Sequence, residues 1–350
     1  GSSAINAMVF VRGHQRDFDE WGASASGWSW ADVEPYFRRM EHWQGIHNQN
    51  RGLFGPVSIS NVSDKVHPLT QRYLEAAQQI GFKLNDDYNS GDLEGACIYQ
   101  ITTSNGVRVS SATAYLKKFR RTKHLKILTQ AQATKILFED QRAVGVEYVH
   151  KGTVRRAKAE SEVILSAGAL LSPHLLQVSG IGPEKLLKAH GVEVLVDSQN
   201  VGRNLSDHLG LDHTLQVNKP SLNQTLRPLY GKLAVALEYI FTRKGPLSMS
   251  LNQGGGFVKS QKGLDVPDLQ LYFSPLSYST APKGTRPLMK PDPYPAVRLG
   301  FNLCKPTSMG LVEICSSNAL LPPKFYGNYL ATEEDREGMI RGMRLMRKIS

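Results

Sequence analysis

Apolar residues recur at intervals of three and four in two early stretches of the chain. One runs from Trp30 to Trp43 behind a candidate cap at Ser29, and the other runs from Leu69 to Ile80. Because about 3.6 residues complete a helical turn, positions with this spacing lie on one face of a helix. The pattern therefore predicts two amphipathic helices, each with an apolar face toward a core.

From Leu125 onward the pattern changes to short runs of β-prone residues separated by polar turns. The runs cover residues 125–128, 133–138, 143–149 and 153–157. Short strands joined by polar turns predict a β-meander.

A further apolar run, Val163–Gly168, follows the meander and ends in small residues. Its composition is typical of a strand that is buried on both faces. The Ser172-Pro173 pair after it predicts the start of a helix, because proline is favoured at the first helical position. A strand, a small-residue turn and a helix together make a ledge where backbone N–H groups can meet a ligand.

The rest of the chain is less regular. Helical spacing returns in Tyr230–Thr242 and again behind a cap at Thr332, in a helix that runs to Ser350. Strand-like runs occupy residues 256–258, 268–273 and 311–315. These segments suit an antiparallel sheet, and so a mixed α/β (α+β) fold, although periodicity alone does not assign the sheet a role.

The two ends of the chain indicate a piece of a longer protein. Residue 1 is Gly rather than Met, and the last helix reaches Ser350 without a Gly, Asn or Pro stop signal. Helices normally end in such a signal. A frayed natural C-terminus is the alternative that the residues leave open.

The composition is that of a globular protein with a substantial core. The chain has 350 residues, of which 41% are hydrophobic and 21% charged, and this length suits two or three domains. No stretch approaches the roughly 20 apolar residues that cross a bilayer, so no transmembrane segment is expected. The three cysteines are far apart. They fit neither a disulfide framework nor a zinc pattern, which favours a reducing compartment and a cytoplasmic location.

The formal net charge of +11 raises the question of a nucleic-acid partner. The densest basic clusters, at residues 117–121 and 155–156, are short, and the other basic residues are spread along the chain. No recognisable nucleic-acid-binding module accompanies them. A solvated basic surface is the better interpretation, and no nucleic-acid partner is expected.

Common catalytic and metal-binding patterns are incomplete in this sequence. The nearest match to Gly-x-Ser-x-Gly, at Gly22–Gly27, misses the second glycine by one place, which argues against a hydrolase. His208 and His213, with Asp207 beside the first, have a spacing that no helix or strand brings together. Hydrogen-bonding histidines are therefore favoured over a metal site. A complete Gly-x-Gly-x-x-Gly is also missing, so this chain shows no dinucleotide pyrophosphate site of its own.

Two segments rich in small residues resemble the signatures of a known enzyme family. Gly1–Gly13 resembles the second half of the first signature of the glucose-methanol-choline (GMC) oxidoreductases, and Gly168–Gly182 resembles their second signature. The likeness is to choline dehydrogenase-like and alcohol dehydrogenase-like members. Lesser landmarks of the family fall in order at residues 27–28, 35–37, 106–116, 143–147, 201–208, 306–310 and 328–330. Several motifs in order across the whole chain are more specific than any one of them.

The resemblance implies an FAD-dependent flavoprotein in which the flavin and ribityl region meets the start of this chain. Small residues at Gly1, Ser2 and Ser3 let backbone N–H groups approach a ligand closely, and Asn6 adds an amide that both donates and accepts. The implied cofactor contacts are Gly1, Ser2, Ser3, Asn6, Ala7, Met8 and Val9. The resemblance also pairs the main chain of Ala133 with adenine, and an ordinary strand alanine is an equal alternative.

Ile5 bears on how FAD would be held. Some family members similar to this chain have a flavin-linking histidine at that position, and an isoleucine cannot form the bond. Non-covalent FAD is therefore expected.

The activity that the resemblance implies is oxidation of an alcohol CH–OH group to an aldehyde or ketone, with hydride passing to flavin N5. In such enzymes a histidine accepts the alcohol proton and a second histidine or asparagine orients the alkoxide. Both belong to a segment beyond Ser350, so no catalytic residue is expected in this chain, which is expected to be inactive alone. The electron acceptor is oxygen or a quinone-like molecule, with a dehydrogenase favoured. A flavin-family remnant that only binds is the alternative from another class.

Asn252 is the candidate substrate residue. In choline dehydrogenase-like members a glutamate shortly before a Gly-Phe pair faces the quaternary ammonium group, and Leu251–Phe257 has Asn252 in that place. A neutral amide supplies no countercharge for a trimethylammonium cation. The resemblance therefore predicts a primary alcohol or a polyol as substrate, with choline as the alternative.

The resemblance also divides the chain between an FAD-binding domain and a substrate domain. Residues 1–60 form the flavin-contacting loop and covering region, and residues 111–210 form the FAD-binding domain. Residues 61–110 and 211–331 belong to the substrate domain, and 332–350 form a helix that returns to the FAD-binding domain.

Overall fold

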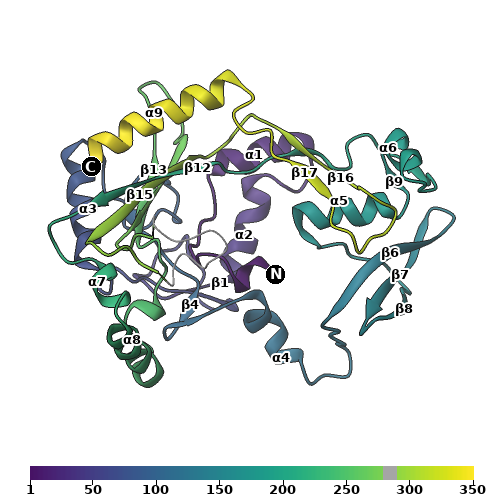
Figure 1. The fold of residues 1–350 in the computed structure, drawn as a ribbon, viewed down its shortest axis with the longest axis horizontal. Helices are drawn as coiled ribbons and strands as arrows, with labels where there is room; N and C mark the ends of the chain where they lie inside the picture. Colours follow the sequence, from purple (N-terminus) through teal and green to yellow (C-terminus); the bar gives the residue numbers. More distant parts are fainter. Residues whose placement is uncertain (279–289) are drawn as a thin grey trace. The chain divides into compact units, whose positions relative to one another are not determined.

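The computed structural model describes residues 1–278 and 290–350. The chain forms two compact units, whose elements are labelled in Figure 1. The first unit comprises Gly1–Thr122, Gly210–Cys304 and Gly338–Ser350, and the second comprises Lys123–Leu209 and Lys305–Glu337. The division of the chain into flavin and substrate domains stays a prediction.

A five-stranded antiparallel sheet forms the centre of the first unit. β13 is buried along its whole length, and a Cβ atom at Gly255 would lie 2.2 Å from the carbonyl oxygen of Leu271. Glycine is therefore needed there for the neighbouring strands to approach. The sheet confirms the antiparallel arrangement that the sequence predicts. Its strand order is β12 (Gly210–Gln216), β15 (Ala296–Leu303), β14 (Leu269–Ser274), β13 (Gly254–Val258) and β3 (Gly95–Ile98).

Two helices pack on this sheet. The ring of Tyr73 in α3 (Pro68–Gln79) stacks on Phe273 at 5.0 Å. In α9 (Glu333–Ile349), Gly342 lets the helix approach the ring of Phe301, because a Cβ there would lie 2.0 Å from it. α3 confirms the helix predicted over residues 69–80, and α9 confirms the one predicted after Thr332.

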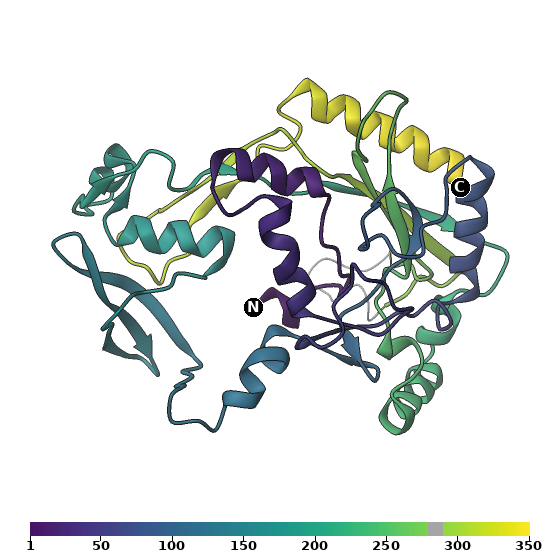
Figure 2. The same ribbon diagram turned by 180° about the vertical axis from the view of Figure 1, so that it is seen from behind.

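Two helices near the N-terminus, α1 (Gln15–Ser24) and α2 (Trp30–Met40), lie against each other (Figure 2). Ser29 caps α2 through a capping box, as its position in the sequence predicts. The helix ends three residues before the predicted end because the chain continues as strand β1 (Glu41–Trp43). β1 pairs in parallel with β2 (Val57–Ile59).

A buried network of charges fixes the chain just after its first nine residues. Arg12 donates to both oxygens of Glu41, at 2.8 and 2.6 Å. Arg51 donates to the same carboxylate at 3.0 Å and to Asp87 at 2.5 Å. Two arginines thus balance two carboxylates, which compensates the cost of burying each charge. Loss of one partner leaves an uncompensated charge and loosens the chain that follows Val9.

α7 (Leu222–Leu226) and α8 (Leu229–Thr242) follow β12 in the chain. α8 confirms the predicted helix, and it ends where Arg243 adopts the left-handed conformation. Only Gly231 and Val235 of α8 are buried. The shorter elements of this unit are η1 (Ser2–Ala4), β4 (Thr103–Ser104), β5 (Val107–Arg108), η2 (Ala112–Leu116), α4 (Lys117–Phe119) and η3 (Pro246–Ser248).

The second unit contains the predicted meander. Strands β6 (Ala131–Glu139), β7 (Arg142–His150) and β8 (Thr153–Lys158) form an antiparallel sheet in that order. Helix α5 (Gly168–Val178) packs against β6, and both contribute to a core around Ile136. The remaining elements are β9 (Ile181–Gly182), α6 (Glu184–Ala189), β10 (Val196–Asp197), β11 (Arg203–Leu205), β16 (Gly310–Glu313) and β17 (Lys324–Tyr326).

Two of the predicted strands are wrong. Residues 125–128 and 163–167 form no strand, and Ile164 is 77% exposed rather than buried. Among the described residues neither run has a strand beside it, and a strand without a partner leaves its backbone groups unpaired. The helix predicted to start at Ser172-Pro173 starts at Gly168 instead. Ser172 Oγ accepts a hydrogen bond of 3.1 Å from the Ala167 N–H, which supports this earlier start.

Candidate functional site

The first nine residues form an exposed stretch of main chain in the first unit. Gly1, Ser2 and residues 4–7 are exposed, whereas Met8 is buried. A Cβ atom added at Gly1 would meet open space. We call Gly1–Val9 the N-terminal segment. Exposed residues of this kind place those main-chain groups that have no partner within reach of a ligand.

Arg108 at the end of β5 holds the N-terminal segment in shape. Its guanidinium donates to the carbonyl oxygen of Ser3 at 3.2 Å, to Asn6 Oδ1 at 2.7 Å and to the carbonyl oxygen of Asn6 at 2.8 Å. Ser3 Oγ adds a bond of 3.2 Å to the Ser111 hydroxyl. Because the guanidinium is a rigid fork of donors, three acceptors bound at once fix the loop closely.

Met8 carries backbone strain in this segment. Its φ is 65°, in the left-handed region that non-glycine residues rarely adopt. Its N–H donates to Asn6 Oδ1 at 3.0 Å and its carbonyl oxygen accepts from the Thr102 N–H at 2.8 Å. Its side chain packs in a cluster that includes Ile101 and Met249. Strain persists only where the surroundings impose it, and such positions gather at ligand sites.

These contacts decide which polar groups of the segment face a ligand. Asn6 Oδ1 is occupied by Met8 and Arg108. Within the described residues, no hydrogen bond is found for Asn6 Nδ2 or for the Ala7 N–H. Asn6 Nδ2 and the Ala7 N–H are therefore two donors left for a ligand, beside the positive charge of Arg108.

Ser250 links the N-terminal segment to the candidate substrate residue. Its hydroxyl donates to the carbonyl oxygen of Ala7 at 2.7 Å and accepts from the Asn252 N–H at 3.2 Å. Asn252 is half-buried, and in the part of the chain that the structure describes its side-chain amide has no hydrogen-bond partner. The structure thus brings Ala7 and Asn252 together through one hydroxyl.

Ala133 lies in the second unit, on edge strand β6. It pairs with Tyr148 of β7, and the register shifts between Ala133 and Lys135. A β-bulge of this kind places an extra residue, here Thr134, on the strand and disrupts the regular ladder. An edge strand next to a bulge has main-chain groups that the sheet does not use. This is the geometry that a main-chain contact at Ala133 needs.

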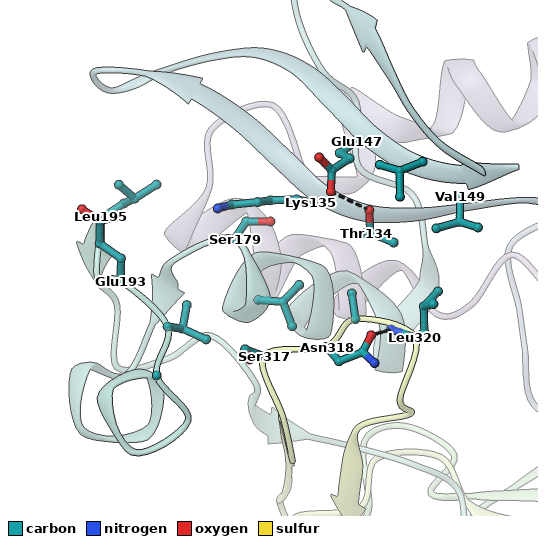
Figure 3. Close-up of a pocket in the computed structure, with 15 residues that line it drawn as sticks. Thr134, Lys135, Glu147, Val149, Ser179, Glu193, Leu195, Ser317, Asn318 and Leu320 are labelled. Carbon is teal, nitrogen blue, oxygen red and sulfur yellow. Dashed lines mark hydrogen bonds between the residues drawn. The ribbon is translucent and has the colours of Figure 1, made fainter. Parts of the chain in front are cut away.

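A cavity of about 490 Å³ borders the residues that follow Ala133. Figure 3 shows Thr134, Lys135 and Glu147 along one side and the loop with Asn318 along the other. Thr134 donates to Glu147 Oε1 at 3.3 Å, so part of its polar lining is already paired. Ala133 itself does not line this cavity.

The second signature segment acts as a structural junction in the second unit. Gln177 on α5 is fully buried, and its amide donates to the carbonyl oxygens of Val201 and Val312 and accepts from the Ile314 N–H. A Cβ atom at Gly202 would lie 2.2 Å from the Val312 oxygen, so glycine is needed there. Gln177 of the second signature and Gly202 of the landmark at residues 201–208 therefore serve the packing of α5 on β16.

Among the described residues, no group of three or more His, Cys, Asp or Glu is placed to hold a metal ion. Asp207 instead accepts from the Tyr329 hydroxyl at 2.5 Å, a bond that raises the pKa of that phenol. His208 and His213 belong to different units. Burial lowers the pKa of His174 on α5, which keeps its imidazole neutral near pH 7.

Comparison with known proteins identifies the family. A family model described as GMC oxidoreductase matches residues 1–210. The chain belongs to the GMC oxidoreductase family. Members of this family are FAD-dependent flavoproteins, so the resemblance drawn from the two signatures is confirmed.

Individual GMC relatives match the chain over its whole length. It is 38% identical to an oxygen-dependent choline dehydrogenase of Vibrio vulnificus (strain YJ016), of which it covers 62%. It is 36% identical to an alcohol dehydrogenase (acceptor) of Pseudomonas putida, of which it covers 63%. The crystal structure of pyridoxine 4-oxidase from Mesorbium loti superposes with a TM-score of 0.84 at 28% identity. That match covers all of this chain and 64% of the solved one. The chain thus spans about 62% of the length of the curated relatives named here.

The N-terminal segment fits FAD, the cofactor of the GMC family. The donors at Asn6 Nδ2 and Ala7 suit the acceptor atoms of a flavin or ribityl chain, and Arg108 suits its electron-rich groups. Ile5 is 85% exposed and offers no atom for a covalent link. These residues are able to hold FAD from one side.

Two residues of this site are absent from the contacts expected from the sequence. Arg108 appears there only within the landmark at residues 106–116, and an arginine in a family landmark was a signal for it. Ser250 carries no sequence signal, because a lone serine before a glycine-rich strand has no motif. Its role depends on a contact between residues 243 positions apart.

The described residues contain no helix that is long and apolar enough to cross a membrane. The three cysteines, all of them among the described residues, form no disulfide; Cys97 is buried and the other two are half-buried.

Proposed function

We propose that this protein is an FAD-dependent oxidoreductase that oxidises the CH–OH group of a primary alcohol or polyol to an aldehyde or ketone. FAD, when bound, supplies the hydride acceptor. The observation that carries the proposal is the link through Ser250, which joins Ala7 of the N-terminal segment to Asn252. The residues expected at the cofactor and the residue expected at the substrate are therefore neighbours.

In this proposal the residues of the chain bind and orient. Arg108 keeps the N-terminal segment in one conformation before the cofactor arrives, which lowers the entropy lost on binding. Asn6 Nδ2 and the Ala7 N–H donate to the flavin or ribityl groups, and Ala133 meets adenine through its main chain. We assign no residue of this chain as the catalytic base.

Asn252 sets the substrate class in this proposal. A carboxamide hydrogen-bonds a neutral hydroxyl or its neighbours, and it gives no charge to balance a quaternary ammonium group. Choline dehydrogenases are among the relatives, so choline is the competing substrate. The neutral amide favours an uncharged primary alcohol or polyol.

We further propose that FAD is held non-covalently, because Ile5 has no nucleophilic atom. We place the protein in the cytoplasm, which suits three cysteines that form no disulfide. Of the two acceptors, we favour a quinone-like molecule over oxygen. Oxygen uptake measured against reduction of a soluble quinone analogue distinguishes them.

The substrate proposal is tested by kcat/KM on matched substrates, with protein expressed from its whole reading frame. We expect at least roughly tenfold preference for a neutral primary alcohol over choline, which corresponds to about 1.4 kcal/mol. Asn252→Glu should shift this ratio toward choline by roughly tenfold, and Asn252→Gln, which keeps the amide, should not. Equal use of choline and neutral alcohols by the unmodified protein would defeat the proposal.

A further inference from the structure

Helix α8 exposes a broad apolar face. At 100° per residue its large exposed side chains fall in one continuous arc about 120° wide. Single exposed hydrophobic residues are ordinary, but a contiguous apolar patch marks an interaction surface. Six residues make up this patch, each more than half exposed: Leu229, Tyr230, Leu233, Leu237, Ile240 and Phe241. We call it the α8 apolar face.

The opposite side of α8 attaches the helix to the first unit. Val235 is buried, and a Cβ atom at Gly231 would lie 2.0 Å from the carbonyl oxygen of Thr225. The Tyr239 hydroxyl donates to the carbonyl oxygen of Gly106 at 3.2 Å. Both views show α8 beside α7 and away from the five-stranded sheet (Figures 1 and 2). The helix is held from one side, and its apolar face is left without a partner in the described residues.

Basic residues flank the α8 apolar face at both ends of the helix. Arg227 and Lys232 lie at its N-terminal end and Arg243 and Lys244 follow its C-terminal end, whereas Glu238 is the one acidic residue from Arg227 to Leu247. Arg243 and Lys244 are exposed. Together with Lys65 they line a cavity of about 600 Å³, whose other polar groups are hydroxyls, amides and the carboxylate of Asp64.

We propose that α8 docks this protein on an anionic lipid surface. The α8 apolar face enters the boundary between headgroups and acyl chains, and the basic cavity at its end receives lipid phosphates. A helix of 14 residues is about 21 Å long, which is shorter than the roughly 30 Å hydrocarbon core of a bilayer. α8 therefore lies in the plane of the surface.

The basic residues favour a lipid surface over the two other occupants of the α8 apolar face, which are a second copy of the chain and a further stretch of polypeptide. Two copies of a chain with a net charge of +11 repel each other, which opposes self-association. A further stretch of polypeptide would cover the apolar face without using Arg243, Lys244 or Lys65. An anionic lipid surface contacts both the α8 apolar face and these basic residues.

Vesicle sedimentation tests the proposal on FAD-loaded protein expressed from its whole reading frame. We expect binding to phosphatidylcholine vesicles that contain phosphatidylglycerol, decreasing with salt, and much weaker binding to pure phosphatidylcholine. Leu233→Glu with Phe241→Glu should lower the partition coefficient at least tenfold. The matched control is Val154→Glu with Phe325→Glu, which changes two exposed apolar residues and the same charge elsewhere. Absence of vesicle binding, or equal loss in both double variants, would overturn the proposal.

A labelling experiment distinguishes the occupants of the α8 apolar face. Leu237→Cys should react quickly with a water-soluble maleimide in free protein and become protected when anionic vesicles are added. The unsubstituted protein measures the background from the three native cysteines. Protection without vesicles contradicts the proposal: if it rises with protein concentration the face is covered by a second copy, and if it does not, by another part of the same chain.

Discussion

At the scale of single residues, the side chain of Asn6 has one end occupied and one end open. Its oxygen is bound by Met8 and Arg108, so only its nitrogen is left for the cofactor that we propose. Arg108 was visible as part of a motif, whereas its three acceptors depend on how β5 meets the N-terminal segment. Motifs report which residue types a site uses, and tertiary contacts decide their roles.

Arg108→Ala should weaken FAD binding. Three carbonyl-type acceptors lose a charged donor at once, and the N-terminal segment becomes mobile, so we expect the dissociation constant to rise by roughly tenfold to a hundredfold. Fluorescence titration of flavin into apoprotein measures it. Arg156→Ala, which removes an exposed arginine in the second unit, serves as the control. Equal FAD affinity of the Arg108 variant and the unmodified protein would show that FAD binding does not need the hydrogen bonds from Arg108 to the N-terminal segment.

At the scale of elements, helices were easier to predict than strands. Helices α2, α3, α8 and α9 carry their apolar faces and caps locally, so their signals are present in the sequence. The runs at residues 125–128 and 163–167 are equally apolar but find no neighbouring strand among the described residues. A strand depends on a partner that periodicity cannot supply. Periodicity predicted the α8 helix correctly but did not reveal that its apolar side is exposed.

Gln177→Leu should destabilise the second unit. The substitution fills similar space but leaves the Val312 oxygen and the Ile314 N–H without their buried partner, at a cost of about 2–4 kcal/mol. Urea denaturation, monitored by fluorescence, measures the change in the free energy of unfolding. Gln132→Leu removes only a bond of 3.4 Å and should change stability by less than about 1 kcal/mol. Similar losses in both variants would contradict the role given to Gln177.

Asp335 makes the stability of the second unit depend on pH. Burial alone would raise the pKa of this carboxyl, but hydrogen bonds from Ser308 and Thr307 outweigh it and lower the pKa below its ordinary value. The unfolded chain therefore binds a proton at higher pH than the folded one, so this stabilisation is present near neutral pH and is lost as pH falls through the folded pKa.

The measurement compares the free energy of unfolding of Asp335→Asn with that of the unmodified protein over a range of pH. The variant should be less stable by about 1–3 kcal/mol at pH 7, because an amide nitrogen faces a backbone N–H. The difference should shrink as the pH falls from about 5 toward 3. A difference that stays constant over that range would assign the effect to packing instead of charge.

At the scale of the whole molecule, the order of motifs predicted more than any single pattern did. The two signatures and the landmarks between them indicated the GMC family, which the family model over residues 1–210 confirms. The chain spans about 62% of its curated relatives, and activity, substrate and acceptor therefore rest on the proposal made above. The link from Ala7 through Ser250 to Asn252 required the three-dimensional structure, because it joins opposite parts of the sequence.

The central claim is that this chain carries the flavin-contacting part of an FAD-dependent alcohol oxidoreductase. It is tested most directly by the visible flavin spectrum of protein expressed from its whole reading frame, recorded without oxygen before and after a neutral primary alcohol is added. We predict a flavin band that the alcohol bleaches, and free FAD in the supernatant after acid precipitation. Protein without flavin, even after incubation with FAD, or a flavin band that no alcohol bleaches, would contradict the account.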